Sequence, residues 1–253
     1  MMKVSVLAAS IIGLTLSTVS WAEASNATWA ATLGFEQART VTPTKKKDVQ
    51  QVETILHGAN VNLLGLTWDN TIAAKWNREG QITVARNWAY GYWNDNFGLS
   101  VDLIKGKWRG QGANIGAVGL AYKDCWGDFC LRVNPTIASI DIHKPSAAKV
   151  TDNGAQLNLK MNYQITDRIN VGFHPQYAYW RSDALGSTLK LDINATFNIT
   201  EDKRHKLTLL NESFVVKNRA SDMKTRFVGE GTPLAGYIPG TESTYKLRYT
   251  YIF

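Results

Sequence analysis

Beyond residue 22, the sequence has no apolar run long enough to cross a membrane as a helix, which needs about 20 residues. It contains two cysteines and four histidines among 253 residues, and no His, Asp and Glu residues have the spacing of metal ligands. A bundle of spanning helices is therefore excluded for this part of the chain. We predict no metal site and no cofactor.

The formal net charge of +7 is not gathered into a pattern that binds nucleic acid. Residues 45–47 form the only run of three lysines, and there is neither a recognition helix nor an RNA-binding signature. Basic residues distributed along the chain instead suit lipopolysaccharide phosphates or anionic solutes. We predict no nucleic-acid partner.

Residues 1–22 have the pattern of a secretory signal peptide. Lys3 is followed by an uncharged apolar run over residues 4–19, and Ser20 and Ala22 place small residues where signal peptidase cleaves. A membrane anchor is the alternative, but the run is roughly 16 residues and a spanning helix needs about 20. We therefore predict removal of residues 1–22 and a single exported domain over residues 23–253.

The two cysteines agree with export. Cys125 and Cys130 lie in the short segment DCWGDFC, and in an oxidising periplasm such a pair is expected to form a disulfide that holds a turn. A zinc site is the alternative, but two thiols without a neighbouring histidine are too few ligands.

The last ten residues, TYKLRYTYIF, alternate between two kinds of side chain. Aromatic and apolar residues take every second position from Tyr245 to Phe253, and Thr, Lys and Arg fill the gaps. Successive side chains of a strand point to opposite faces, so this segment is predicted to have one apolar and one basic face. That pattern is typical of a transmembrane β-barrel, whose strands face lipid on one side and the lumen on the other.

Many other segments show the same alternation, and they lead to a count of about twelve strands. The clearest covers residues 188–199, and the glycine-rich residues 110–119 read as a strand with close backbone approach, a bulge or a bend. The pattern loses its parity at residues 60–64. We predict an all-β fold, a transmembrane antiparallel β-barrel of twelve strands, with ten or fourteen as alternatives because residues 60–121 can be divided differently.

An even number of strands places both termini at the periplasmic end. The expected short periplasmic turns lie near residues 68–71, 166–168 and 200–204. The expected long external loops are residues 41–49, 142–154 and 218–243.

Basic residues occupy the polar positions of these strands, with Glu36, Asp102 and Asp192 on the same faces. Lysines and arginines lining a pore favour anionic solutes, and lumenal Tyr and Trp offer flat surfaces for sugar rings. Alternatively, the charges pair and fill the barrel, since twelve strands lie between filled and open barrels. The predicted pore-lining residues are Lys75, Arg132, Lys160, Lys190, Lys246 and Arg248.

The sequence resembles the small monomeric outer-membrane porins for acidic sugars, the KdgM/NanC group. The resemblance lies in the mature length, the twelve expected strands, the basic polar register and the ending YTYIF. The resemblance implies passive uptake of acidic sugars through the outer membrane. It also implies contact with lipid and lipopolysaccharide, and insertion by the barrel-assembly machinery through the C-terminal strand.

Two other functions are compatible with a barrel. A barrel enzyme of the lipase or deacylase type needs a nucleophile beside a histidine, for which Ser139, Asp141 or Ser146 near His143 are the candidates. A structural or adhesion barrel would use its outer loops, above all residues 223–240. We predict no enzymatic activity, because no nucleophile motif accompanies any histidine.

Overall fold

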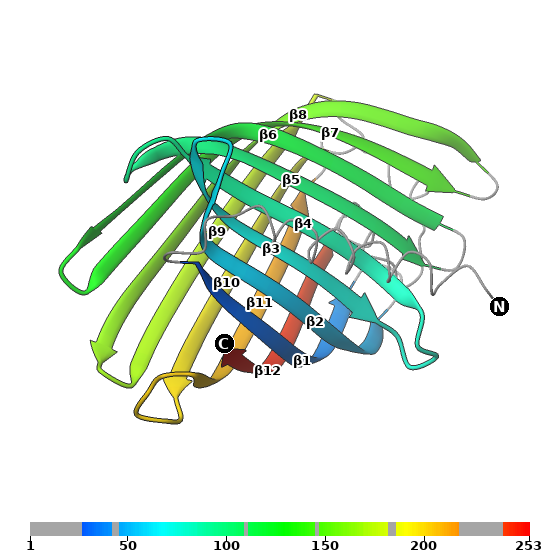
Figure 1. The fold of residues 1–253 in the computed structure, drawn as a ribbon. Helices are drawn as coiled ribbons and strands as arrows, with labels where there is room; N and C mark the ends of the chain where they lie inside the picture. Colours follow the sequence, from blue (N-terminus) through cyan, green and yellow to red (C-terminus); the bar gives the residue numbers. More distant parts are fainter. Residues whose placement is uncertain (1–26, 42–45, 109–110, 145–146, 182–185, 218–239) are drawn as a thin grey trace.

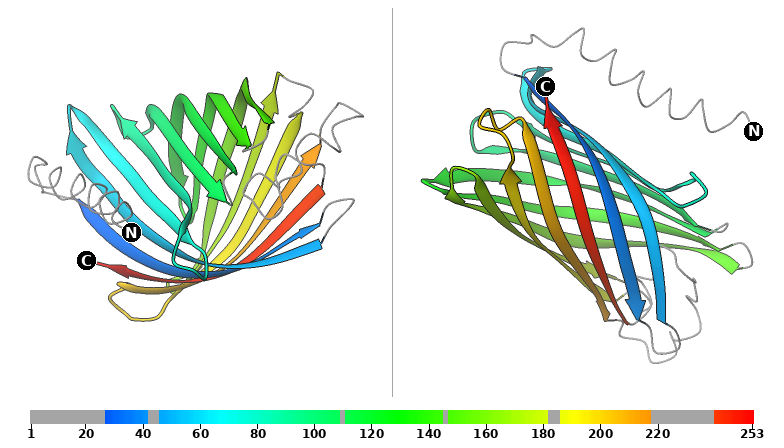
Figure 2. Two further views of the ribbon diagram at one scale, coloured as in Figure 1. Left: turned by 90° about the vertical axis from the view of Figure 1, so that its right-hand side faces the viewer. Right: turned by 90° about the horizontal axis from the view of Figure 1, so that it is seen from below.

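The protein is a closed barrel of twelve antiparallel strands (Figure 1). The computed structural model describes residues 27–41, 46–108, 111–144, 147–181, 186–217 and 240–253. Each strand pairs with its neighbours in sequence, and β1 pairs with β12 to close the barrel. The view from below in Figure 2 shows β12 in red beside β1 in blue. The predicted all-β fold and the strand number are therefore confirmed.

The strands in chain order are β1 (Thr28–Val41), β2 (Lys46–Leu63), β3 (Leu66–Trp76), β4 (Ile82–Tyr92), β5 (Phe97–Trp108), β6 (Gln111–Trp126), β7 (Phe129–Lys144), β8 (Ala147–Thr166), β9 (Ile169–Trp180), β10 (Ser187–Asn198), β11 (His205–Lys217) and β12 (Gly240–Ile252). Within these described ranges there is no helix of the length and apolarity that crossing a membrane requires. The predicted signal peptide, residues 1–22, lies outside the described residues.

The two faces of the wall differ as the alternation predicts. On β12 Leu247 is 46% exposed while Lys246 is 5% exposed, and on β10 Ile193 is 57% exposed. Apolar side chains thus cover the outer surface and polar ones turn inward, the reverse of a soluble protein and the arrangement of a barrel in lipid.

The barrel has two distinct ends. The end that carries the N-terminal start of β1 and the C-terminal Phe253, which we call the turn end, holds the turns at residues 64–65, 93–96, 127–128, 167–168 and 199–204. At the opposite end, which we call the loop end, β3 and β4 are joined by the turn at residues 77–81. Most of the predicted external loop 218–243 lies outside the described part, and its last residues, from Gly240, belong to β12. The turns predicted near residues 166–168 and 200–204 are both found at the turn end.

Three predicted connections are wrong. Residues 68–71 lie inside β3, and the turn is at Leu64 and Gly65, whose φ angles are 54° and 75°. Residues 41–49 and 142–154 are not long loops, because β1 pairs with β2 up to Val41 and Lys46, and β7 with β8 up to residues 144 and 147. A polar sequence is thus equally typical of a loop and of a strand that extends beyond the apolar, lipid-facing part of the wall.

The lost parity at residues 60–64 reflects a β-bulge. The pairing of β2 with β3 shifts between Gly58 and Val61, and Asn60 takes a left-handed φ of 57°. The Asn60 N–H donates to Asp69 Oδ1 at 3.3 Å. The bulge thus changes which residues of β2 face inward and positions a carboxylate of β3 inside the barrel.

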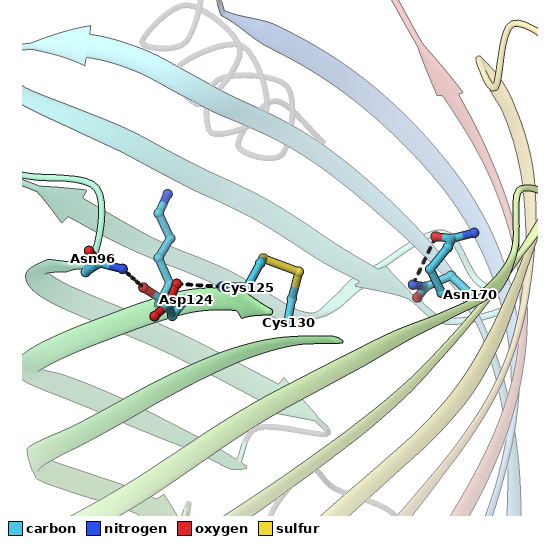
Figure 3. Close-up of a disulfide and its surroundings, with 7 residues drawn as sticks. Asn96, Asp124, Cys125, Cys130 and Asn170 are labelled. Carbon is cyan, nitrogen blue, oxygen red and sulfur yellow. Dashed lines mark hydrogen bonds between the residues drawn. A yellow bond between two sulfur atoms is a disulfide. The ribbon is translucent and has the colours of Figure 1, made fainter. Parts of the chain in front are cut away.

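A disulfide joins β6 and β7 across their turn. Cys125 and Cys130 are direct cross-strand partners, and their sulfur atoms are bonded next to Gly127, whose φ is 59°. Figure 3 shows the bond at the ends of the two strands, with Asn96 and Asp124 beside it. The bond therefore fixes the register of the hairpin at the turn end.

Replacing both cysteines with alanine is expected to lower the free energy of unfolding by about 2 kcal/mol, because so short a loop restricts the unfolded chain only modestly. Urea titration of the refolded protein in lipid vesicles measures this change. Reduced wild-type protein is the matched control and should unfold at the same urea concentration as the double variant. A difference between the two would show that the substitutions, and not the lost bond, cause the effect.

Candidate functional site: the charged lumen

A cavity of about 610 Å³ occupies the middle of the barrel, and inward side chains from all twelve strands line it. We call it the central cavity. Its lining includes seven lysines and arginines and five aspartates and glutamates, an excess of two positive charges. The structure places all six predicted basic residues in this lining: Lys75, Arg132, Lys160, Lys190, Lys246 and Arg248.

Six of the charged residues form a continuous chain of ion pairs around one side of the wall, from β3 through β1, β12 and β11 to β10. Lys246 is its centre, with Nζ 3.4 Å from Glu36 Oε2 and 3.2 Å from Glu212 Oε2. Lys75 lies 3.0 Å from Glu36 at one end. Lys190 lies 3.0 Å from both Glu212 and Asp192 at the other. We call this group the ion-pair chain, and it links five strands from inside the barrel.

Two further pairs neutralise arginines. Arg248 Nε donates to Glu53 Oε2 at 2.8 Å, from β12 to β2. Arg86 forms a two-bond contact with Asp102, with donor–acceptor distances of 2.9 and 2.6 Å. Such bidentate contacts fix the guanidinium plane.

Three lumenal cations cover aromatic rings. The guanidinium of Arg86 lies 4.7 Å from the Trp88 ring centre, and that of Arg132 lies 4.3 Å from the Tyr90 ring centre. Lys123 Nζ lies 3.9 Å from the centre of Tyr92. One face of each ring is thus occupied, which reduces the flat surface that the sequence offered for stacking of sugar rings.

Lys160 differs from the other basic residues. It is exposed to the lumen, and within the described ranges it is the one member of the seven lysines and arginines lining the central cavity without an ion pair. Its ammonium group is therefore available to a solute.

Sequence reasoning missed five charged residues of the lumen: Glu53, Asp69, Arg86, Lys123 and Glu212. Two signals were present. On β4, Arg86 shares the inward face with Trp88 and Tyr90, so the charged position follows the alternation of the strand although that face is largely aromatic. Glu53 lies directly across from Lys75, which pairing of β2 with β3 would have indicated.

The three histidines whose side chains the structure describes have hydrogen-bonding partners, and that of His205 is the hydroxyl of Tyr249. His57 Nδ1 is 2.7 Å from the hydroxyl of Thr71, and His174 Nε2 is 3.4 Å from Asn162 Oδ1. The side chain of His143, the candidate for a barrel enzyme, lies outside the described part of the structure. The described residues contain no group of three or more His, Cys, Asp or Glu side chains able to hold a metal ion.

Neither a protein-family model nor a curated protein matches the sequence. The structure is similar to the NanC porin, with a TM-score of 0.52 and 11% identity over 87% of this chain and 98% of that one. It is also similar to the COG4313 outer membrane channel from Pseudomonas putida F1, with a TM-score of 0.51 and 13% identity over 89% and 95% of the two chains. A KdgM porin in complex with disordered oligogalacturonate gives 0.44 and 9% over 86% and 98%.

The first two likenesses show that the chain has the fold of outer-membrane channels. The predicted resemblance to the KdgM/NanC group is thus confirmed at the level of the fold. At these identities the likeness extends to the fold alone, so solute preference has to be argued from the residues of this chain.

Proposed function

We propose that the protein is an outer-membrane channel through which small hydrophilic anions, such as acidic sugars, diffuse passively. The observation that carries this function is the central cavity, whose described lining has two more positive than negative charges and, at Lys160, one ammonium group without an ion pair among the described residues. A wet, basic lumen lowers the energy of an anion inside the barrel and raises that of a cation. No catalytic step is part of the proposal.

We also propose how the protein is exported and how it is oriented in the outer membrane. Residues 1–22 direct export and are removed, residues 23–253 form the barrel, and the turn end faces the periplasm. The exposed apolar side chains of the outer wall contact lipid and lipopolysaccharide. The C-terminal strand, with Tyr249 and Phe253 exposed on the outer face, is the element that the barrel-assembly machinery receives.

Recordings in planar lipid bilayers test the channel. Under a salt gradient, the refolded protein should conduct, and its reversal potential should have the sign of anion preference. Lys160→Glu changes the charge of the lining by two units and should abolish that preference. Lys105→Glu is the matched control. Lys105 is exposed on the outer side of β5, so this substitution makes the same change of charge outside the lumen. Absent conductance, or cation preference in the unaltered protein, would overturn the proposed function.

A further inference from the structure

Three cations lie side by side on consecutive strands. Lys123 on β6 is the cross-strand partner of Arg132 on β7, which in turn is the partner of Lys160 on β8. All three side chains point inward, and we call them the cation row. Directly opposed residues on neighbouring strands have Cβ atoms about 5 Å apart, so like charges there repel. The row therefore needs an anion to balance it.

Among the described residues, one carboxylate forms ion pairs with the row. Asp69 comes from β3, and its Oδ2 lies 2.8 Å from Arg132 and 3.5 Å from Lys123. Lys160 has no ion pair among the described residues. Two of the three positive charges are left without a carboxylate of their own.

The same barrel contains a like-charge pair that is fully bridged. Asp192 on β10 and Glu212 on β11 are also direct cross-strand partners, and Lys190 Nζ lies 3.0 Å from each carboxylate. The acidic pair thus has its own counter-ion in Lys190, while the three positive charges of the cation row have the one paired carboxylate of Asp69. The difference indicates that the missing charge at the row comes from outside the chain.

The row also lies in a cavity. A second cavity of about 320 Å³, which we call the mouth cavity, is lined by the cation row together with Asn96, Asn162 and the disulfide at the turn end. Asp95 and Asp124 also line this cavity. Among the described residues, neither carboxylate forms an ion pair with Lys160. Arg132, Lys160 and Asn162 line both cavities, which places the row where the two meet.

The disulfide lies next to the cation row, on the same hairpin as Lys123 and Arg132. Cys125 follows Lys123 by two positions, and Cys130 precedes Arg132 by two, so all four side chains share the inward face of one hairpin. Fixing the hairpin register holds the first two cations of the row at a set separation. The disulfide is thus a positioning element for the row.

We propose that the cation row is a binding site for one oxyanion group, the carboxylate or sulfate of a solute leaving the central cavity at the turn end. Lys160 and Arg132 supply the charge, and the Asn162 amide supplies a neutral donor beside them. Asp69 competes with the solute for Arg132 and Lys123, which keeps binding weak enough for release. This site rests on the proposed function, because the solute reaches it through the central cavity.

Isothermal titration of the refolded protein in non-ionic detergent tests the site, with sodium glucuronate and sodium sulfate as probes and glucose as the uncharged match. We expect saturable binding of both anions and none of glucose. Lys160→Gln should raise the dissociation constant about tenfold, the effect of one charge-assisted hydrogen bond. Asp69→Asn should lower it severalfold, because the internal competitor loses its charge while the amide oxygen still accepts from the Asn60 N–H.

Opposite effects of two substitutions at one site separate binding from misfolding, since a damaged barrel loses affinity in both. Lys105→Gln, on the outer wall, is the control and should leave the affinity unchanged. Equal affinities of the wild type and Lys160→Gln, or binding of glucose as tight as that of glucuronate, would overturn the site. Anion-selective conductance without saturable binding rejects the site alone, and binding without conductance rejects the proposed channel alone.

Discussion

Replacing Lys246 with methionine is expected to lower the free energy of unfolding by about 3–5 kcal/mol, the loss found when one partner of a buried ion pair is removed. Lys246 is 5% exposed and lies between the carboxylates of Glu36 and Glu212. Glu36 is itself 2% exposed, so water cannot replace the lost ammonium group there. Methionine is unbranched and one atom shorter than lysine, so it fills most of the same space while removing the ammonium group.

The measurement is the midpoint and slope of urea unfolding for barrels refolded into lipid vesicles. Arg39→Met is the matched control, because the Arg39–Asp48 ion pair has side chains that are 65% and 54% exposed. An exposed pair of this kind contributes up to about 1 kcal/mol. If Lys246→Met proved no more destabilising than Arg39→Met, the ion-pair chain would not be holding β1, β11 and β12 together.

The architecture could be predicted because it depends on a local signal. A period of two along each strand decides which side chains face lipid, and no knowledge of distant residues is needed. Leu247 and Lys246 differ by one position and take opposite faces, as their chemistry requires. The same signal selected the six basic residues that line the central cavity.

The ends of the strands could not be predicted in the same way. Beyond the apolar belt both faces of a strand are polar, and the alternation disappears while the backbone ladder continues. Residues 142–154 therefore resemble a loop in sequence, although β7 and β8 pair through most of them. The turn predicted near residues 68–71 was misplaced because it depends on Leu64, whose left-handed φ angle has no signature in the sequence.

The cation row could not be predicted from single strands at all. It depends on which residue of β6 opposes which residue of β7 and β8, and on the bulge that positions Asp69 from β3. Register is a property of pairs of strands, and a slip of one residue would send Arg132 and Lys160 to opposite faces. Partner strands fix this information, so it becomes visible only in the assembled barrel.

Gly119→Ala is expected to destabilise the barrel by about 1–3 kcal/mol or to prevent refolding, because overpacking forces the backbone apart. A Cβ atom at Gly119 would lie 2.0 Å from the Pro135 carbonyl oxygen and 2.7 Å from Thr136 Cα. Both are backbone atoms, which cannot swing aside as the end of a side chain does. The glycine-rich segment is therefore a strand with close backbone approach, one of the three interpretations that its sequence allows.

Gly116→Ala supplies the comparison on the same strand. Its Cβ would meet only Leu103 Cδ2, at 3.8 Å, which is ordinary van der Waals contact. Alanine also restricts the unfolded chain, so this substitution should leave the free energy of unfolding unchanged or raise it by up to about 1 kcal/mol. Urea unfolding of both variants in the same vesicles measures the contrast. Equal stabilities would show that β6 and β7 can separate at Pro135 without cost, because a proline there has no N–H to contribute to the ladder.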